Sequence, residues 1–185
     1  MASQQLLHRL QLLQQAEEAL SPALEQAAET LVQTVIGGGK VMICGDEAGF
    51  CTAGEFTHKL VHTYQVERPP LPACLLTTQF ASADDALYER QVQALGKPED
   101  TLVCILGGQD SRILTRAIYQ AHTLQLPVIV IDNKLSRPSA AELWEQDVEI
   151  CAPCDNPALV HELQVTLVHC LCEAIDHQLF GAPGS

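Results

Sequence analysis

The chain has 185 residues, 47% of them hydrophobic, and its 23 acidic and 10 basic side chains give a formal net charge of −13. This length and composition fit one globular domain with a sizeable core, and the acidic balance argues against direct nucleic-acid binding, which depends on Lys and Arg. Without a basic and apolar leader or a run of about 18 apolar residues, we expect a cytoplasmic protein that does not contact a membrane.

The first 36 residues predict a pair of helices ahead of the main core. Leucines recur at near-helical spacing from residue 3 to residue 19. Ser21-Pro22 then supplies an N-cap followed by proline at the first helical position, and Gly37-Gly38-Gly39 ends the second helix. Because this pair is more apolar than one domain needs, we expect it to pack on a second copy of the chain in a homo-oligomer, most simply a tetramer.

Beyond residue 40, short apolar runs alternate with helical stripes. Continuous runs are typical of parallel strands buried on both faces, and the intervening segments are long enough for crossover helices. We therefore predict one domain over residues 1–185, with a helical pair at 1–36, an α/β core at 40–180 and a tail at 181–185. The core is a five-stranded, doubly wound parallel sheet in a flavodoxin-like α/β/α sandwich. The five predicted strands are Val41 to Cys44, Ala73 to Leu76, Thr101 to Leu106, Val128 to Asp132 and Val148 to Cys151.

The turn after the first predicted strand is the most informative segment. Ligands of such sheets bind beyond the carboxyl ends of the strands, and phosphate turns aim backbone N–H groups at the anion. Here Asp46 and Glu47 occupy that place, between Gly45 and Gly49. A carboxylate near a helix N-terminus is stabilised by about 0.3–1 kcal/mol, and a phosphate must compete with it for the same donors. The turn thus disfavours a phosphorylated ligand.

Several segments together resemble the sugar-isomerase (SIS) domain family, nearly from end to end. The resemblance is closest to the phosphoheptose isomerase branch, and within it to proteins of the DiaA type, which bind the replication initiator DnaA. The segments that carry it are Cys44-Gly45 leading into a helix, Glu67-Arg68-Pro69, Leu71-Pro72-Ala73, 91–96, Ser111-Arg112 and 169–176.

The resemblance also implies where an isomerase keeps its chemistry. The glutamate base of the isomerases corresponds to Lys59 here and their histidine to His169, and the turn at 106–111 keeps one phosphate-binding hydroxyl of three. We therefore expect vestigial catalytic positions with no turnover, no cofactor and no metal, because the Lys59 ammonium repels a dication. The implied pocket residues are Gly45, Asp46, Gly49, Glu55, Ser111, His161 and His169.

On these grounds the sequence predicts a non-catalytic interaction protein that binds DnaA and regulates replication initiation. Leu179 and Phe180, at the end of the last helix, are the predicted partner-binding residues. One alternative is a phosphoheptose isomerase or a phosphosugar-binding protein of the sedoheptulose 7-phosphate class. Another is a thiol-redox protein that uses Cys151 and Cys154, the only cysteine pair with redox spacing.

Overall fold

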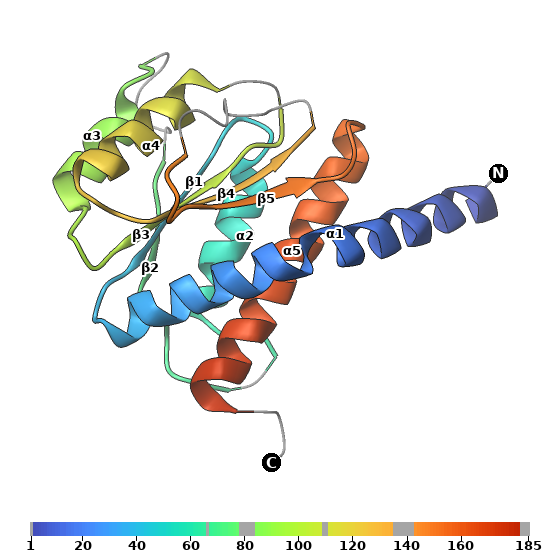
Figure 1. Ribbon diagram of the computed structural model, residues 1–185, viewed down its shortest axis with the longest axis horizontal. Coiled ribbons are helices and arrows are strands. Elements are labelled where there is room, and N and C mark those ends of the chain that lie inside the picture. The colour runs from blue at the N-terminus through green and yellow to red at the C-terminus, as the bar shows by residue number, and fades with distance from the viewer. Residues whose placement is uncertain (1, 66, 78–83, 109–110, 135–142, 182–185) are drawn as a thin grey trace.

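A five-stranded parallel sheet forms the centre of the computed structural model, in the order β2-β1-β3-β4-β5 (Figure 1). The structure describes residues 2–65, 67–77, 84–108, 111–134 and 143–181. This order is that of a flavodoxin-like doubly wound sheet, so the predicted fold class is confirmed. The strands are β1 Val41–Gly45, β2 Ala73–Leu75, β3 Thr101–Ile105, β4 Val128–Asn133 and β5 Val148–Ala152.

Helices cover both faces of the sheet (Figure 1). One layer holds α1 Ala2–Ile36, α2 Phe50–Val61 and α5 Pro157–Phe180, and the other holds α3 Leu87–Leu95 and α4 Arg112–Thr123. Every residue of β1, β3 and β4 is buried between these layers. Each face has its own apolar cluster, with Phe56 and Leu171 on one side and Tyr88 and Ile118 on the other. Because these strands are buried on both faces, their sequences are continuous apolar runs.

The N-terminal segment is one continuous helix, so the prediction of two helices is wrong. Pro22 lies inside α1, and the Ser21 hydroxyl donates to the Glu17 carbonyl at 2.6 Å instead of capping a new helix. Proline in a helix interior costs about 3 kcal/mol, and the residues next to Pro22 in the sequence do not by themselves offset that cost. Burial on both sides of Pro22 offsets that cost. The buried residues are Leu12, Ala16, Leu20, Ala27, Ala28, Leu31 and Val32.

The first turns of α1 extend away from the body of the protein (Figure 1). Leu6, Leu10 and Leu13 are 65%, 59% and 41% exposed there. Arg9, four residues before Leu13 on the same face of the helix, forms a two-point ion pair with Glu162 of α5, at 2.7 and 2.9 Å. This end of α1 is therefore tethered to the body beside the leucines that it presents to solvent.

By length and composition alone, helix α5 could cross a membrane. However, half of its most apolar stretch is buried inside the protein. Leu163, Leu167 and Leu171 pack into the core beneath α1 and α2. Asn156 caps the helix by accepting from the N–H groups of Ala158 and Leu159. The apolar character of α5 is therefore explained by its place in the core.

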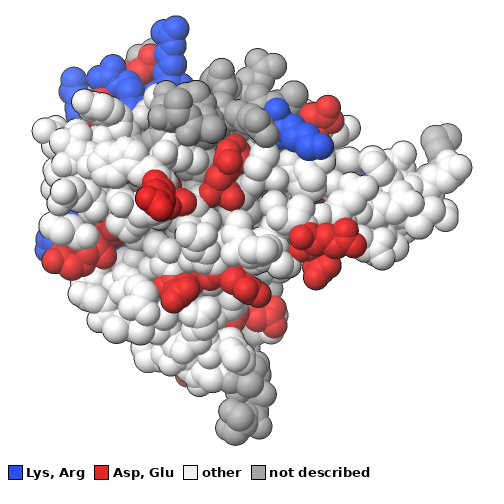
Figure 2. Space-filling model, in the orientation of Figure 1, with Lys and Arg blue, Asp and Glu red and all other residues white. Residues whose placement is uncertain are grey.

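Acidic side chains spread across the face of the molecule that Figure 2 shows, and most of the Lys and Arg visible there lie toward its upper edge, with a few blue atoms at its left edge. Among the described residues of this face there is no continuous basic surface of the kind that binds a phosphate backbone. The absence of direct nucleic-acid binding stays a prediction.

Candidate functional site

The turns after β1 and β3 meet at the carboxyl edge of the sheet, because β1 and β3 are adjacent parallel strands. Two glycines allow the close approach. A Cβ on Gly49 would lie 2.2 Å from the Ile105 carbonyl oxygen, and a Cβ on Gly107 would lie 2.8 Å from Ala48. Both distances are too short for any other residue, so the two turns form one tightly packed unit.

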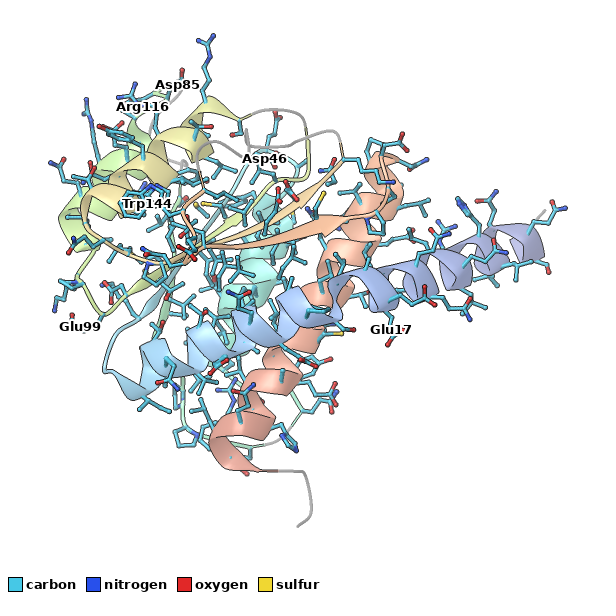
Figure 3. All side chains as sticks on the ribbon, viewed as in Figure 1. Glu17, Asp46, Asp85, Glu99, Arg116 and Trp144 are labelled. Atoms are coloured by element: carbon cyan, nitrogen blue, oxygen red, sulfur yellow. The ribbon has the colours of Figure 1, made fainter. Side chains whose placement is uncertain are left out.

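The Asp46 carboxylate lies between these turns, beyond the strand ends (Figure 3). Its Oδ1 accepts from the N–H groups of Gly49 at 2.6 Å and Gly107 at 3.0 Å, and its Oδ2 accepts from Gly108 at 2.9 Å. We call these three N–H groups the glycine cradle. Converging backbone N–H groups beside a helix N-terminus are the usual receptor for a bound anion. In this chain the anion is Asp46, as the turn sequence predicts.

A pocket of about 400 Å³ opens beside the cradle. The Tyr88 hydroxyl, buried beneath it, donates to the Gly45 carbonyl at 2.9 Å and ties α3 to the first turn. The pocket is lined by Gly45, Asp46, Glu47, Phe50, Tyr88 and Ile113. Its volume suits a small metabolite, and its walls combine two carboxylates with apolar and aromatic surface.

A second polar group lies along the contact between α2 and α5. Glu55 Oε1 is 3.2 Å from Nε2 of His169 and 3.4 Å from Nζ of Lys59, one turn further along α2. The ring of Tyr64 lies 5.2 Å from the His169 ring. Glu55 is five residues beyond Phe50 of the pocket, which corresponds to about 7.5 Å along a helix axis. Helix α2 therefore connects the pocket to this group.

The hydrogen bond from His169 lowers the pKa of Glu55, the charge of Lys59 adds to that effect, and burial opposes it. Glu55 is therefore a carboxylate that only accepts hydrogen bonds, and Nε2 of His169 carries the shared proton. A carboxylate base beside a protonated imidazole nitrogen is an arrangement suited to general acid–base catalysis. The Glu55–His169 pair can hold and transfer a proton.

The structure brings the predicted site residues together in two groups. Gly45, Asp46 and Gly49 meet at the cradle, and Glu55, Lys59 and His169 meet between α2 and α5. His161 lies on α5 as well, with Nδ1 3.4 Å from the hydroxyl of Thr52. Ser111 belongs to neither group: it precedes α4, and its side chain does not cap that helix. Gln109 and Asp110, beside it in the turn, lie outside the described residues.

Sequence reasoning missed Gly107 and Gly108 as donors to the cradle, although both glycines were visible after a buried strand. The expected phosphate ligands of this turn were hydroxyl groups, whereas the donors in the structure are backbone N–H groups. The resemblance places Lys59 at the base position, and Glu55 lies four residues before Lys59 on the same face of the helix. The carboxylate next to His169 is therefore present, one turn earlier than the resemblance implies.

Metal binding and thiol chemistry find little support in the described part of the chain. No three His, Cys, Asp or Glu side chains are grouped there to hold a metal ion. Burial, followed by the charge of Asp155, raises the pKa of Cys154, which lowers its thiolate fraction. Since the thiolate is the reactive species, this weakens the thiol-redox alternative.

Known proteins resemble the chain over almost its whole length. A family model described as the SIS domain matches residues 8–133. The phosphoheptose isomerase of Thiobacillus denitrificans is 33% identical over 174 residues, which cover 90% of this chain and 88% of the relative. That of Shewanella sediminis is 34% identical over 181 residues, with 94% and 92% covered.

Solved structures of phosphoheptose isomerases share the fold of this chain. A phosphoheptose isomerase from Francisella tularensis superposes with a TM-score of 0.87 at 33% identity, covering 95% of this chain and 96% of that one. The phosphoheptose isomerase GmhA from Neisseria gonorrhoeae superposes with a TM-score of 0.85 at 27% identity, with the same coverage.

These similarities overturn the prediction of a non-catalytic protein that binds DnaA. The relatives that match nearly end to end are named phosphoheptose isomerases, and none of those given above is an initiator-binding protein. Neither the structure nor these similarities test the predicted partner role of Leu179 and Phe180. In the structure, Leu179 packs against the core, while Phe180 is 45% exposed.

Proposed function

The chain belongs to the SIS domain family, in its phosphoheptose isomerase branch, and on that premise we propose that it is a sugar isomerase. The proposed reaction interconverts the aldose and ketose forms of a phosphorylated sugar of the sedoheptulose 7-phosphate class. The proposed location is the cytoplasm. Support comes from the names of the relatives and from one feature of this chain, the Glu55–His169 pair.

The pair supports this reaction because aldose–ketose isomerisation moves a proton between adjacent carbons. That step needs a base to take the proton and an acid to supply one to the oxygen. Glu55, ionised through its contact with His169, is the proposed base, and His169 is the proposed acid. Lys59, 3.4 Å from Glu55, is the proposed source of the positive charge that stabilises the oxyanion of the intermediate.

Purified protein is expected to convert sedoheptulose 7-phosphate, and His169→Ala is expected to lower turnover by more than about 100-fold, because the proton donor is removed. A coupled spectrophotometric assay measures the rates, and melting temperatures verify that the variant is folded. His177→Ala is the matched control, since His177 is an exposed histidine on the same helix. Stabilisation of the wild type by the sugar phosphate without turnover would instead identify a binding protein and refute the isomerase proposal.

We further propose that the exposed leucines of α1 pack against a second copy of the chain. Leu6, Leu10 and Leu13 follow one another at helical spacing on the projecting turns. Leu10→Glu/Leu13→Glu is therefore expected to convert a homo-oligomer into a single chain of 20.1 kDa, measured by light scattering. Gln4→Glu/Gln15→Glu adds the same charge at exposed positions on the opposite side and is expected to keep the oligomer. A wild-type mass of one chain at micromolar concentration would contradict the proposal.

A further inference from the structure

We propose that Asp46 determines the phosphate affinity of the site, because its carboxylate is a resident anion in the glycine cradle. A phosphate group and the Asp46 carboxylate are alternative occupants of the cradle, so a phosphate binds there only when Asp46 is displaced. The inference rests on the proposed function, since it concerns how the phosphate of the sugar is received.

The first argument is the completeness of the hydrogen bonding. All three N–H groups of the cradle donate to Asp46, at 2.6, 3.0 and 2.9 Å. Each is a hydrogen bond to an ionised acceptor and is stronger than one between neutral groups. A phosphate that approaches these donors must therefore replace bonds that already exist.

The second argument is how closely the Asp46 side chain packs on the two turns. A Cβ on Gly49 would lie 3.1 Å from Asp46 Oδ1, and a Cβ on Gly108 would lie 3.4 Å from Oδ2. The carboxylate is thus in close contact with the backbone of both turns. A phosphate therefore cannot reach the same three donors while the Asp46 carboxylate holds its position.

The third argument is the charge of the neighbouring pocket. Two of its six lining residues, Asp46 and Glu47, are acidic and none of the six is basic. Like charges at short distance disfavour an incoming phosphate, and more so where solvent is partly excluded. The tethered carboxylate also competes as an intramolecular ligand, whose effective concentration exceeds that of a metabolite in solution.

The proposal is tested by titrating inorganic phosphate into the wild type and into Asp46→Ala at constant ionic strength, with isothermal calorimetry. Removing the carboxylate leaves three unoccupied donors, so Asp46→Ala is expected to bind phosphate at least about tenfold more tightly, and to gain more thermal stability from it. Equal phosphate affinity in the wild type and Asp46→Ala would overturn the proposal.

Glu47→Ala is the matched control, because it removes the same charge from the neighbouring pocket residue. Its expected gain in phosphate affinity is less than about threefold, from reduced repulsion alone. A gain equal to that of Asp46→Ala would mean that net charge and not occupation of the cradle is responsible, and would also overturn the proposal.

Two further measurements keep the proposal testable if Asp46→Ala folds poorly. They also separate this proposal from the proposed isomerase activity. Asp46→Asn keeps the size of the side chain and is expected to gain phosphate affinity as well, while the melting temperature of the wild type is expected not to rise with phosphate relative to chloride. A rise in the wild type as large as that in Asp46→Asn would contradict the resident anion. Inorganic phosphate binding does not depend on turnover, so failure of the isomerase assay and failure of this inference are observed independently.

Discussion

Arg68→Ala is expected to lower the free energy of unfolding by about 3–5 kcal/mol, because it breaks a buried ion pair and leaves one charge without a partner. Nε of Arg68 lies 2.5 Å from Oδ1 of Asp176, and the two side chains are 1% and 8% exposed. The guanidinium also donates to the carbonyls of Lys59 at 2.9 Å, Leu60 at 3.0 Å and Pro69 at 3.1 Å. It therefore fastens the end of α2 and the following segment to α5, and urea unfolding measures the loss.

Arg116→Ala is the control for this prediction. Nε of Arg116 lies 2.5 Å from Oε2 of Glu89, the same distance as in the Arg68–Asp176 pair. The Arg116 side chain, however, is 51% exposed. Solvent screening makes the expected loss much smaller than that of Arg68→Ala. Equal losses in Arg116→Ala and Arg68→Ala would show that the burial of the Arg68–Asp176 pair contributes nothing.

The loss in Arg68→Ala is expected to shrink at acidic pH. Burial raises the pKa of Asp176, and Arg68 opposes that effect, so the pKa rises further in the variant. A carboxyl group whose pKa is raised by folding favours the folded state at a pH below its unfolded pKa. That contribution is lost as the pH rises through the folded pKa. Urea unfolding at several pH values measures this dependence, and a loss independent of pH would contradict it.

Glu55→Gln is expected to lower kcat for the sugar phosphate by about 10²–10⁴-fold, because the amide cannot take up the transferred proton. Lys59→Met keeps most of the carbon stem and removes only the charge near Glu55, so a loss of tenfold or less is expected there. Steady-state kinetics on both variants separates the two assignments. A larger loss in Lys59→Met than in Glu55→Gln would make Lys59 the base and refute the role of Glu55.

The pKa of Glu55 offers a test that does not depend on turnover. The hydrogen bond from His169 is the largest cause that lowers this pKa, so the carboxyl is expected to titrate below the ordinary value of about 4.3. His169→Ala removes that bond, and the pKa of Glu55 is expected to rise. Titration of the side-chain carboxyl signal by NMR measures both values. An unchanged pKa in His169→Ala would show that the two side chains are not in contact in solution.

The sequence by itself determined the sheet and the occupied turn. A parallel strand buried on both faces must be apolar at successive residues, so Val41, Thr101 and Val128 begin runs that are recognisable without any partner strand. The carboxylate at Asp46 was predictable in the same way, because a residue that follows a strand and precedes a helix lies beside the helix N-terminus.

Only the tertiary structure decided the path of α1, the partners of Asp46 and the contact of Glu55 with His169. Helix α1 runs through Pro22 because residues on both sides of it are buried against the same body, a gain that local sequence does not contain. Asp46 and its donors Gly107 and Gly108 are 61 and 62 residues apart, and Glu55 is 114 residues from His169. Contacts across such separations depend on the packing of whole strands and helices, and no spacing along the chain encodes them.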